Sequence, residues 1–202
     1  MLKRLLIASN NPHKLKEFAA MLAPLGIEAV PQGELFEGEA EEPHDTFLEN
    51  ALAKAHFAAR ATGLAALADD SGLVVPALGG EPGVHSAHYA GKDGDRDTRD
   101  ARNNAKLVEA MRGVADRRAF YYGVLVFVRG PHDPTPIVTE GFWHGEIVEA
   151  GRGTGGFGYN PHFLAANGLT AAELDDAEKN RLSHRGQALA AMAQRLRERE
   201  GG

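Results

Sequence analysis

Strand-like and helix-like segments alternate along the first third of the chain, and this alternation constrains the possible fold more than any other feature. The apolar runs at 2–8 and 27–31 are typical of short buried strands, and residues 13–25 carry apolar side chains at helical spacing. A second helix is expected to begin near Thr46, where Thr46 and Glu49 form a capping box. Strands that alternate with helices favour parallel pairing, so the sequence predicts an α/β protein with a partly parallel sheet.

The middle of the chain predicts antiparallel strands instead. Residues 119–128 are dense in Tyr, Val and Phe, and the segments 137–144 and 146–149 are expected to be antiparallel neighbours of that strand. A last helix is predicted from about residue 183 to residue 200. We therefore expect one domain over residues 1–202, an α/β fold with a mixed sheet flanked by helices, two lobes and a cleft between them.

Composition excludes several classes of site. The chain has no cysteine, which rules out disulfides, thiolate metal sites and a cysteine nucleophile, so a metal must be bound by oxygen or imidazole. The net charge of −6 argues against broad nucleic-acid binding, and no apolar run approaches the length of a membrane span. The apolar N-terminal run ends too soon for a signal peptide. We expect a cytoplasmic protein that binds neither nucleic acid nor membrane.

Two adjacent carboxylates, Asp69 and Asp70, follow a strand-like run at 64–68 and precede Ser71-Gly72. We expect the strand to end here in a turn, at the sheet edge where ligands gather in α/β proteins. Neighbouring carboxylates repel each other, and burial makes this worse, so the pair calls for a cation or a shared proton. Mg²⁺ fits because it prefers oxygen ligands and is commonly bound together with phosphates. A polar turn without a ligand is the alternative.

An acidic loop over residues 32–45 precedes the second predicted helix. Glu41 or Glu42 could approach Asp70 and complete a magnesium site. The alternative for either glutamate is a solvated position on an ordinary surface loop.

The segment from Ser9 to Lys14 joins the first predicted strand to the first predicted helix. A strand–loop–helix connection leaves free backbone N–H groups at the positive end of the helix, which suits a phosphate. Lys14 adds a cation and Ser9 a hydroxyl, although the segment lacks the P-loop pattern. A capped helix start with a solvated lysine is the alternative.

A glycine-rich loop spans residues 151–158 and is followed by Asn160-Pro161. Its glycines match a dinucleotide-binding spacing, but the proline excludes a clean helix start, so the glycines are expected to let the backbone approach a ligand. Phe157 and Tyr159 would offer aromatic faces to a base. A flexible hairpin loop is the alternative.

Cationic side chains gather around the predicted start of the last helix. Lys179, His184 and Arg185 lie close together in sequence, with Ser183 as a candidate N-cap. Cations near a helix N-terminus are unfavourable unless an anionic ligand offsets them, and arginine suits a phosphate or a base edge. A solvated basic turn is the alternative. A Ser–His–Asp triad through Ser183 and His184 is not expected, because adjacent helix residues do not face each other.

Taken together, these segments carry a family resemblance that covers about residues 3–196. The motifs are Ser9-Asn10-x-x-x-Lys14-x-x-Glu17, Thr46-Phe47-x-Glu49-Asn50-Ala51, Ala68-Asp69-Asp70-Ser71-Gly72-Leu73, Gly80-x-Pro82-Gly83-Val84-x-Ser86-Ala87-x-Tyr89, Gly155-Gly156-Phe157-Gly158-Tyr159 and Ser183-His184-Arg185-Gly186. In order and spacing, the chain resembles the RdgB-type family of non-canonical purine NTP pyrophosphatases, also called dITP/XTP or inosine triphosphate pyrophosphatases. The resemblance implies Mg²⁺-dependent hydrolysis of ITP, dITP and XTP to the monophosphate and pyrophosphate. It also implies a homodimer, an elongated mixed sheet and a nucleotide in the cleft between the lobes.

The resemblance also implies roles for individual residues. Asp70 corresponds to the general base and to a metal ligand, with Asp69 beside it, and Glu42 matches the second metal carboxylate better than Glu41. The implied triphosphate contacts are Ser9, Asn10, Asn11, Pro12, His13, Lys14 and Ser71. The implied nucleoside and base contacts are Phe157, Gly158, Tyr159, Asn160, Lys179, His184 and Arg185.

One residue departs from the family pattern. Most relatives carry aspartate where this chain has Asn160, and asparagine keeps an acceptor oxygen, adds a donor and loses the charge. Base preference, or the charge balance beside Lys179, is therefore expected to differ. Donors such as His184 or Arg185 would select a purine with a 6-keto oxygen, but guanine also has one, and its rejection does not follow from the sequence.

Two other functions share some of these features. A Maf-like nucleotide pyrophosphatase would also use a phosphate loop, but the segments 156–159 and 183–186 argue against it. A non-catalytic nucleotide-binding dimer would leave the paired carboxylates without a use, although they are costly to hold.

Overall fold

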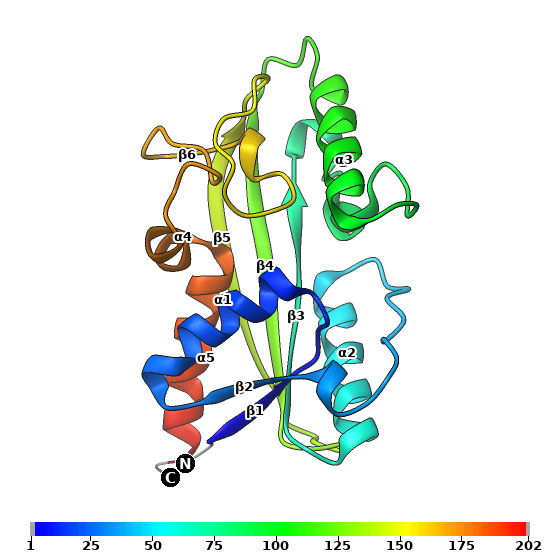
Figure 1. Ribbon diagram of the computed structural model, residues 1–202, viewed down its shortest axis with the longest axis vertical. Helices are drawn as coiled ribbons and strands as arrows, with labels where there is room; N and C mark the ends of the chain where they lie inside the picture. The colour runs from blue at the N-terminus through cyan, green and yellow to red at the C-terminus, as the bar shows by residue number, and fades with distance from the viewer. Residues whose placement is uncertain (1–2, 201–202) are drawn as a thin grey trace. The chain divides into compact units, whose positions relative to one another are not determined.

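The structure is a computed structural model that describes residues 3–200. Its strands form one mixed six-stranded sheet in the order β2-β1-β3-β4-β5-β6 (Figure 1). The strands are β1 (Arg4–Ile7), β2 (Glu28–Pro31), β3 (Ala66–Val74), β4 (Arg118–Val128), β5 (Ile137–Ile147) and β6 (Phe163–Ala165). The helices are α1 (Pro12–Leu22), α2 (Phe47–Thr62), α3 (Arg96–Ala110), α4 (Asp176–Leu182) and α5 (His184–Glu200). The predicted α/β class and mixed sheet are confirmed.

The N-terminal strands pair as the sequence predicts. Strand β1 runs parallel to β2 and to β3, with Leu6 opposite Ala66 and Ile7 opposite Leu67. At the other end of the sheet β5 and β6 are antiparallel. Helix α2 begins at the predicted capping box, where the Thr46 hydroxyl oxygen accepts from the N–H of Glu49 at 3.2 Å. Local sequence signals therefore fix this part of the fold.

Some sequence-based boundaries are wrong, and one helix is missed. The strand expected over residues 64–68 does not end in a turn at the aspartates, because β3 continues through both and ends at Val74. The segments 137–144 and 146–149 form the single strand β5. Helix α4 was not expected, although Asp175 caps it by accepting from the N–H of Glu178 at 2.7 Å.

The described chain divides into two compact units, and their boundaries do not fall in linkers. Unit 1 comprises residues 1–70, 123–141 and 185–202, and unit 2 comprises residues 71–122 and 142–184. Three of the boundaries lie inside β3, β4 and β5, and the fourth lies at the start of α5. The single domain and the cleft between two lobes stay predictions.

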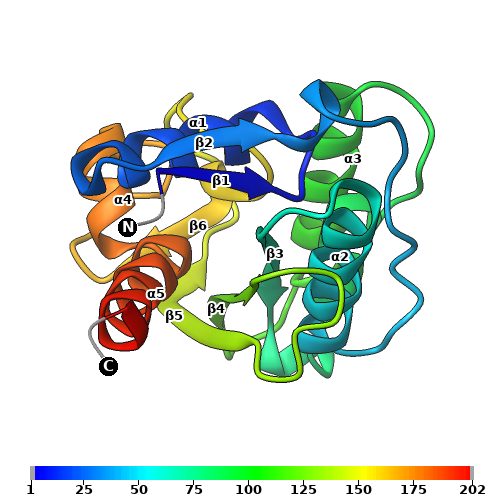
Figure 2. The same ribbon diagram turned by 90° about the horizontal axis from the view of Figure 1, so that it is seen from below.

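Each unit has its own apolar core. In unit 1, α1 and α5 pack on one face of the strands through a cluster that includes Phe18, Leu67, Leu125 and Met192. Helix α2 lies on the side of these strands opposite to α5 (Figure 2). The core of unit 2 gathers Leu73, Leu107, Tyr121, Trp143 and Phe163, among other residues. Each core includes residues of β3, β4 and β5.

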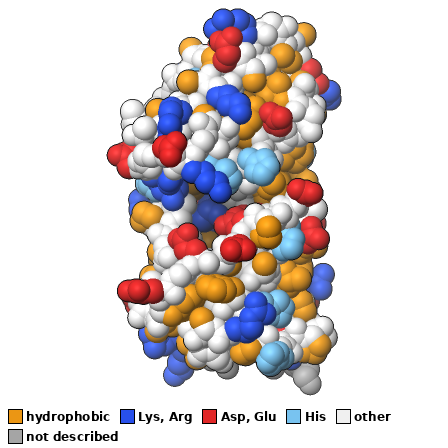
Figure 3. All heavy atoms as spheres, turned by 90° about the vertical axis from the view of Figure 1, so that its right-hand side faces the viewer, with side chains coloured by type: hydrophobic (Ala, Val, Ile, Leu, Met, Phe, Trp, Pro, Cys, Tyr) orange, Lys and Arg blue, Asp and Glu red, His pale blue; other side chains and the backbone are white. Residues whose placement is uncertain are grey.

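The surface carries no large field of one charge on the face that Figure 3 shows, where acidic and basic side chains are mixed. Within residues 3–200, no helix is both long enough and apolar enough to span a membrane.

Candidate active site

Asp69 and Asp70 point to opposite faces of β3, because consecutive side chains alternate along a strand. Asp69 contacts the ammonium of Lys14, with Nζ 2.5 Å from Oδ2, whereas Asp70 accepts from Lys54 Nζ at 2.8 Å. The sequence predicts a cation or a shared proton beside this pair, and the structure places a lysine ammonium next to each carboxylate. Each has its own cation, and these ion pairs let turn-forming residues remain in the middle of a strand.

The position of the aspartates relative to β1 is nevertheless the predicted one. Strand β1 ends at Ile7, opposite Leu67, and the N–H of Ala8 donates to the Leu67 carbonyl at 2.8 Å. Asp69 and Asp70 lie just beyond this point on β3. They are thus at the carboxyl end of β1, where α/β proteins collect ligands, although they are not at the end of their own strand.

Asp69 is the centre of a buried ionic cluster in unit 1. Arg185 donates from Nε to Oδ1 at 3.3 Å and from Nη2 to Oδ2 at 3.2 Å, and its Nη1 pairs with Glu17. Burial alone would raise the pKa of the Asp69 carboxyl, but Arg185 and Lys14 outweigh it and hold that pKa far below its usual range. Both Asp69 oxygens already accept from cations, so its role as a metal ligand has less support than its role in positioning Lys14 and Arg185.

Lys14 is a partly buried cation beside other cations. Burial lowers the pKa of its ammonium; Asp69 opposes this, while Lys54 and Arg185 lower the pKa further. The result is a pKa below the ordinary value for lysine. An anionic ligand beside Lys14 would stabilise the charged form of its ammonium.

Asp70 has one carboxylate oxygen available. Its Oδ1 accepts from Lys54, but its Oδ2 is buried and has no hydrogen-bond partner among the described residues. Burial raises the pKa of Asp70 above its ordinary value, against the opposing effect of Lys54. Burial would also lower the pKa of Lys54, but Asp70 and Glu42 outweigh it and raise that pKa. An orphaned buried carboxylate oxygen is costly and calls for a donor or a cation.

This donor set fits a divalent cation that takes oxygen ligands. Lys54 Nζ is also 3.4 Å from Oε1 of Glu42, so one ammonium stands between the two carboxylates where a metal could bind. Within residues 3–200, no three His, Asp or Glu side chains gather into a complete metal site. Mg²⁺ typically takes only one or two carboxylates and completes its shell with water and phosphate oxygens. Asp70 and Glu42 could therefore hold it.

The loop before α1 is organised differently from the prediction. The Asn11 side-chain oxygen accepts from the N–H groups of His13 at 3.0 Å and Lys14 at 3.4 Å, and Ser9 Oγ accepts from the N–H of Asn11 at 3.1 Å. The expected free N–H groups are thus already capped. Asn10 donates to Glu39 at 3.3 Å, and Pro12 occupies the first helical position, where it has no N–H to offer. Side chains, rather than backbone N–H groups, remain to bind a phosphate here.

Sequence reasoning missed Lys54 and gave no role to Glu17. Lys54 lies one turn after Asn50 on α2, on a face otherwise buried through Ala51, Ala55 and Ala58. A lysine among buried alanines at helical spacing was the available signal, because a buried lysine needs a carboxylate partner.

The glycine-rich loop of unit 2 is held by two side chains from α3. Asp100 Oδ2 accepts from the N–H of Gly158 at 2.7 Å, and Asn104 Nδ2 donates to the carbonyl of Gly158 at 2.9 Å. The peptide groups of Gly158 are therefore already bonded, and the loop is fixed next to Phe157. Neither Asp100 nor Asn104 was expected from the sequence.

The two aromatic residues of this loop differ in exposure. The ring of Tyr159 is buried in the core, and its hydroxyl donates to the Ser86 carbonyl at 2.8 Å, so the expectation that this ring offers a face to a base is wrong. Phe157 is half-buried, with the Lys179 ammonium 5.2 Å from its ring centroid. Phe157 alone keeps the predicted stacking role.

Of the remaining residues predicted to contact the base, His184 and Asn160 lie beside Tyr121, whereas Arg185 belongs to unit 1, where it pairs with Asp69 and Glu17. The ring of His184 stacks on Tyr121 at a centroid distance of 5.1 Å and an angle of 14°, and the Tyr121 hydroxyl lies 3.3 Å from Oδ1 of Asn160. Lys179 is buried and lies within α4 rather than at a helix start. Ser71 is half-buried on β3, and Ser183 is buried between α4 and α5. The predicted residues thus form two groups: Asp69, Asp70, Lys14, Glu42 and Arg185 in unit 1, and Phe157, Asn160, Lys179 and His184 in unit 2.

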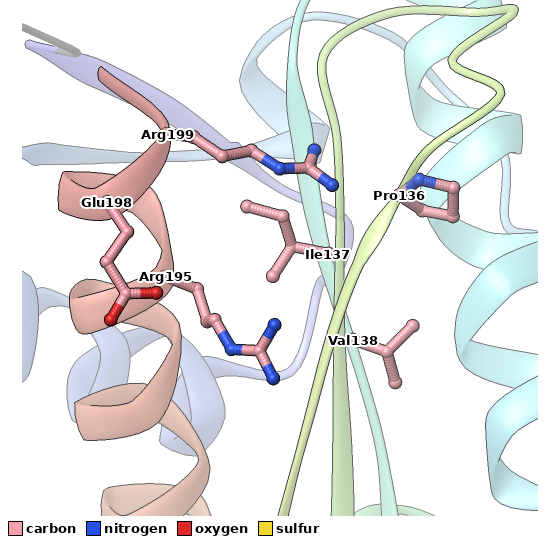
Figure 4. Close-up of a pocket in the computed structure, with 6 residues that line it drawn as sticks. All are labelled: Pro136, Ile137, Val138, Arg195, Glu198 and Arg199. Atoms are coloured by element: carbon pink, nitrogen blue, oxygen red, sulfur yellow. The ribbon is translucent and has the colours of Figure 1, made fainter. Parts of the chain in front are cut away.

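A separate pocket in unit 1 contains none of these residues. It is lined by Pro136, Ile137, Val138, Arg195, Glu198 and Arg199, and the two arginines point from α5 toward β5 (Figure 4).

Comparison with known proteins identifies the family of this chain. The model of the Ham1 family matches residues 5–195. The chain belongs to the Ham1 family. A dITP/XTP pyrophosphatase of Burkholderia pseudomallei is 62% identical over 196 residues, covering 96% of this chain and 94% of that protein. The protein of the same name from Ralstonia nicotianae is 60% identical, covering 97% and 98%. The solved structure of a HAM1 protein from Coxiella burnetii is similar with a TM-score of 0.88 and 44% identity, covering 98% of this chain and 100% of that chain.

Proposed function

We propose that this protein hydrolyses the non-canonical purine nucleoside triphosphates ITP, dITP and XTP to the monophosphate and pyrophosphate. The observation that carries this proposal is the identity of about three residues in five, over nearly the whole chain, to proteins named dITP/XTP pyrophosphatase. The two groups of site residues give that reaction a physical basis in this chain.

Unit 1 supplies the chemistry in this proposal. Asp70 and Glu42 would hold Mg²⁺, with Asp69 as the less favoured ligand, and the ion when bound would neutralise charge on the phosphate oxygens. Asp70 is the general base: it orients a water and accepts its proton for in-line attack at the α-phosphorus. Lys14 holds the leaving pyrophosphate, and Arg185, fixed by Asp69 and Glu17, keeps the local field cationic. The side chains of Ser9, Asn10, Asn11 and His13, with Ser71 of unit 2, are the further candidate phosphate contacts.

Unit 2 supplies base recognition. Phe157 stacks on the purine, while Lys179, His184 and Asn160 provide donors to its edge, so that a keto oxygen is accepted and the amino group of adenine is not. Gly158 presents the loop backbone that Asp100 and Asn104 fix.

The test is pyrophosphate release from ITP, dITP, XTP, dATP, dGTP and dTTP, each with Mg²⁺ and with EDTA. Release from ITP, dITP and XTP that depends on Mg²⁺, with little from the standard nucleotides, supports the proposal. Activity centred on dTTP would indicate a Maf-like pyrophosphatase instead, and nucleotide binding without any turnover would indicate a regulatory dimer.

We further propose that the protein is a cytoplasmic homodimer, as the family resemblance implies. Light scattering after size-exclusion chromatography tests the oligomeric state. A mass of twice 21.6 kDa supports a dimer, and a mass of 21.6 kDa contradicts it.

A further inference from the structure

Asn160 carries a buried hydrogen-bond donor that no protein acceptor satisfies. Asn160 is only 5% exposed. Its side-chain Oδ1 accepts a hydrogen bond from the Tyr121 hydroxyl at 3.3 Å. Its Nδ2 has no hydrogen-bond partner in the part of the chain that the structure describes. Leaving such a donor unpaired is costly, so its retention points to an acceptor that arrives with a ligand.

The unpaired amide is aimed at the glycine-rich loop. Gly156 is exposed with φ of +75°, and a Cβ built on it would collide with Nδ2 of Asn160 and would lie 3.2 Å from Nζ of Lys179. Only glycine at this position leaves room for the amide nitrogen, which packs against the loop with the ammonium of Lys179 close by. The ring of Phe157 lies on the same loop, with its centroid 5.2 Å from that ammonium. This corner of unit 2 offers donors beside an aromatic face.

We propose that the Asn160 amide donates a hydrogen bond to the 2-carbonyl oxygen of a xanthine base, which makes XTP the preferred substrate. This inference rests on the proposed function and specifies its base preference. The 6-keto purines differ at position 2, where xanthine has an oxygen, hypoxanthine a hydrogen and guanine an amino group. A donor at this position is satisfied by xanthine, left unpaired by hypoxanthine and opposed by the amino donor of guanine.

Charge also favours xanthine over hypoxanthine and guanine at this position. Xanthine nucleotides lose a ring proton near neutral pH, and the negative charge is shared with their carbonyl oxygens. A hydrogen bond to a charged acceptor is stronger than one between neutral groups, and the neighbouring ammonium of Lys179 adds attraction. Aspartate in place of Asn160 would instead set a carboxylate against an anionic base. The neutral amide thus favours XTP over ITP and also accounts for the rejection of GTP.

The experiment measures kcat/KM for XTP, ITP and GTP in the wild type, in Asn160→Asp and in Asn160→Ala. Asn167→Asp is the matched control, because Asn167 is an exposed residue of the same unit whose side-chain oxygen accepts from the N–H of Leu169. We expect the wild type to rank XTP above ITP and ITP above GTP. Asn160→Asp should lower the XTP to ITP ratio by roughly tenfold or more, while the control leaves it unchanged. Asn160→Ala should lower the ratio less and relax the rejection of GTP.

An unchanged XTP to ITP ratio in Asn160→Asp would overturn the inference, because it would mean that the amide oxygen, rather than the nitrogen, faces the base. If Asn160→Asp does not fold, Asn160→Ala decides the question through the same ratio. A wild type that prefers ITP over XTP would also overturn it. Failure of the proposed function would look different, since no non-canonical nucleotide would then be hydrolysed by the wild type.

Discussion

The two groups of candidate site residues differ in the physical interactions that they can offer to a ligand. The unit 1 group is dense in charge: Lys14, Lys54 and Arg185 are buried or nearly so among carboxylates, and their pKa values are shifted. The unit 2 group contains one ammonium, that of Lys179, and otherwise consists of aromatic rings, an amide and a glycine loop held by hydrogen bonds. Fixed charges suit the triphosphate, which is identical in all nucleoside triphosphates. Hydrogen-bond donors and aromatic rings suit the base, which differs from one nucleoside triphosphate to another. Selectivity is therefore expected to lie in unit 2 and turnover in unit 1.

The largest effect is expected at Asp70. Asp70→Asn removes the proposed base and a proposed metal carboxylate but keeps the shape of the side chain, so kcat should fall by roughly a thousandfold while nucleotide binding persists. Steady-state pyrophosphate release and calorimetric binding of the monophosphate measure the two properties. Asp45→Asn, at an exposed position in unit 1, is the control, and turnover above a tenth of the wild-type rate in Asp70→Asn would remove Asp70 from its role.

Asp69 should matter more for stability than Asp70 does. Asp69→Asn leaves Lys14 and Arg185 without their shared carboxylate, which should lower the free energy of unfolding by about 3 kcal/mol. The Asp69 pKa is depressed in the folded state, so its stabilisation is complete above the unfolded pKa of about 4 and is lost as pH falls toward the folded pKa. Urea unfolding should show the difference between wild type and variant shrinking below pH 4. A difference that grows on acidification would contradict this assignment.

Phe157 should affect substrate binding without affecting the chemistry. Phe157→Ala removes the ring on which the base is proposed to stack, so KM for XTP and ITP should rise roughly tenfold at nearly constant kcat. Phe142→Ala is the matched control, because Phe142 is an exposed phenylalanine of the same unit. A fall in kcat with unchanged KM would contradict the assignment of Phe157 to base binding.

The smallest effect is expected at the support of the glycine-rich loop. Asp100→Ala removes the acceptor for the N–H of Gly158, which should raise KM about threefold through a less ordered loop. Asp97→Ala, on an exposed position in the first turn of α3, should leave KM unchanged. Equal KM values for the two variants would show that the Gly158 contact does not order the binding site.

The sequence could predict the elements whose signals are local. The capping residue Thr46 and the helical apolar spacing place α2 and α1, and the alternation of elements predicts the parallel pairing of β1 with its neighbours. The course of β3 could not be read in this way, because Asp69, Asp70 and Ser71 favour a turn locally. Cations from α1, α2 and α5, which lie far away in sequence, satisfy the two aspartates and let the strand continue.

The candidate site shows the same limit. Residue types predicted the carboxylates and the need for a cation beside them, but not the partner of each carboxylate, so Lys54 was missed. Burial also could not be read from the motif around Gly158, since nothing local distinguishes the buried ring of Tyr159 from the half-buried ring of Phe157. The burial of each ring depends on the core of unit 2, which is assembled from segments that are distant in sequence.

The most direct test of separate roles is the substrate ranking of a unit 1 variant that retains some activity. We would measure kcat/KM for XTP, ITP and dITP in Lys14→Met, beside the wild type. If unit 1 acts on the triphosphate alone, the variant should lose activity by the same factor for each substrate, and the ranking should not change. A ranking that changes would contradict the division of labour between the two groups.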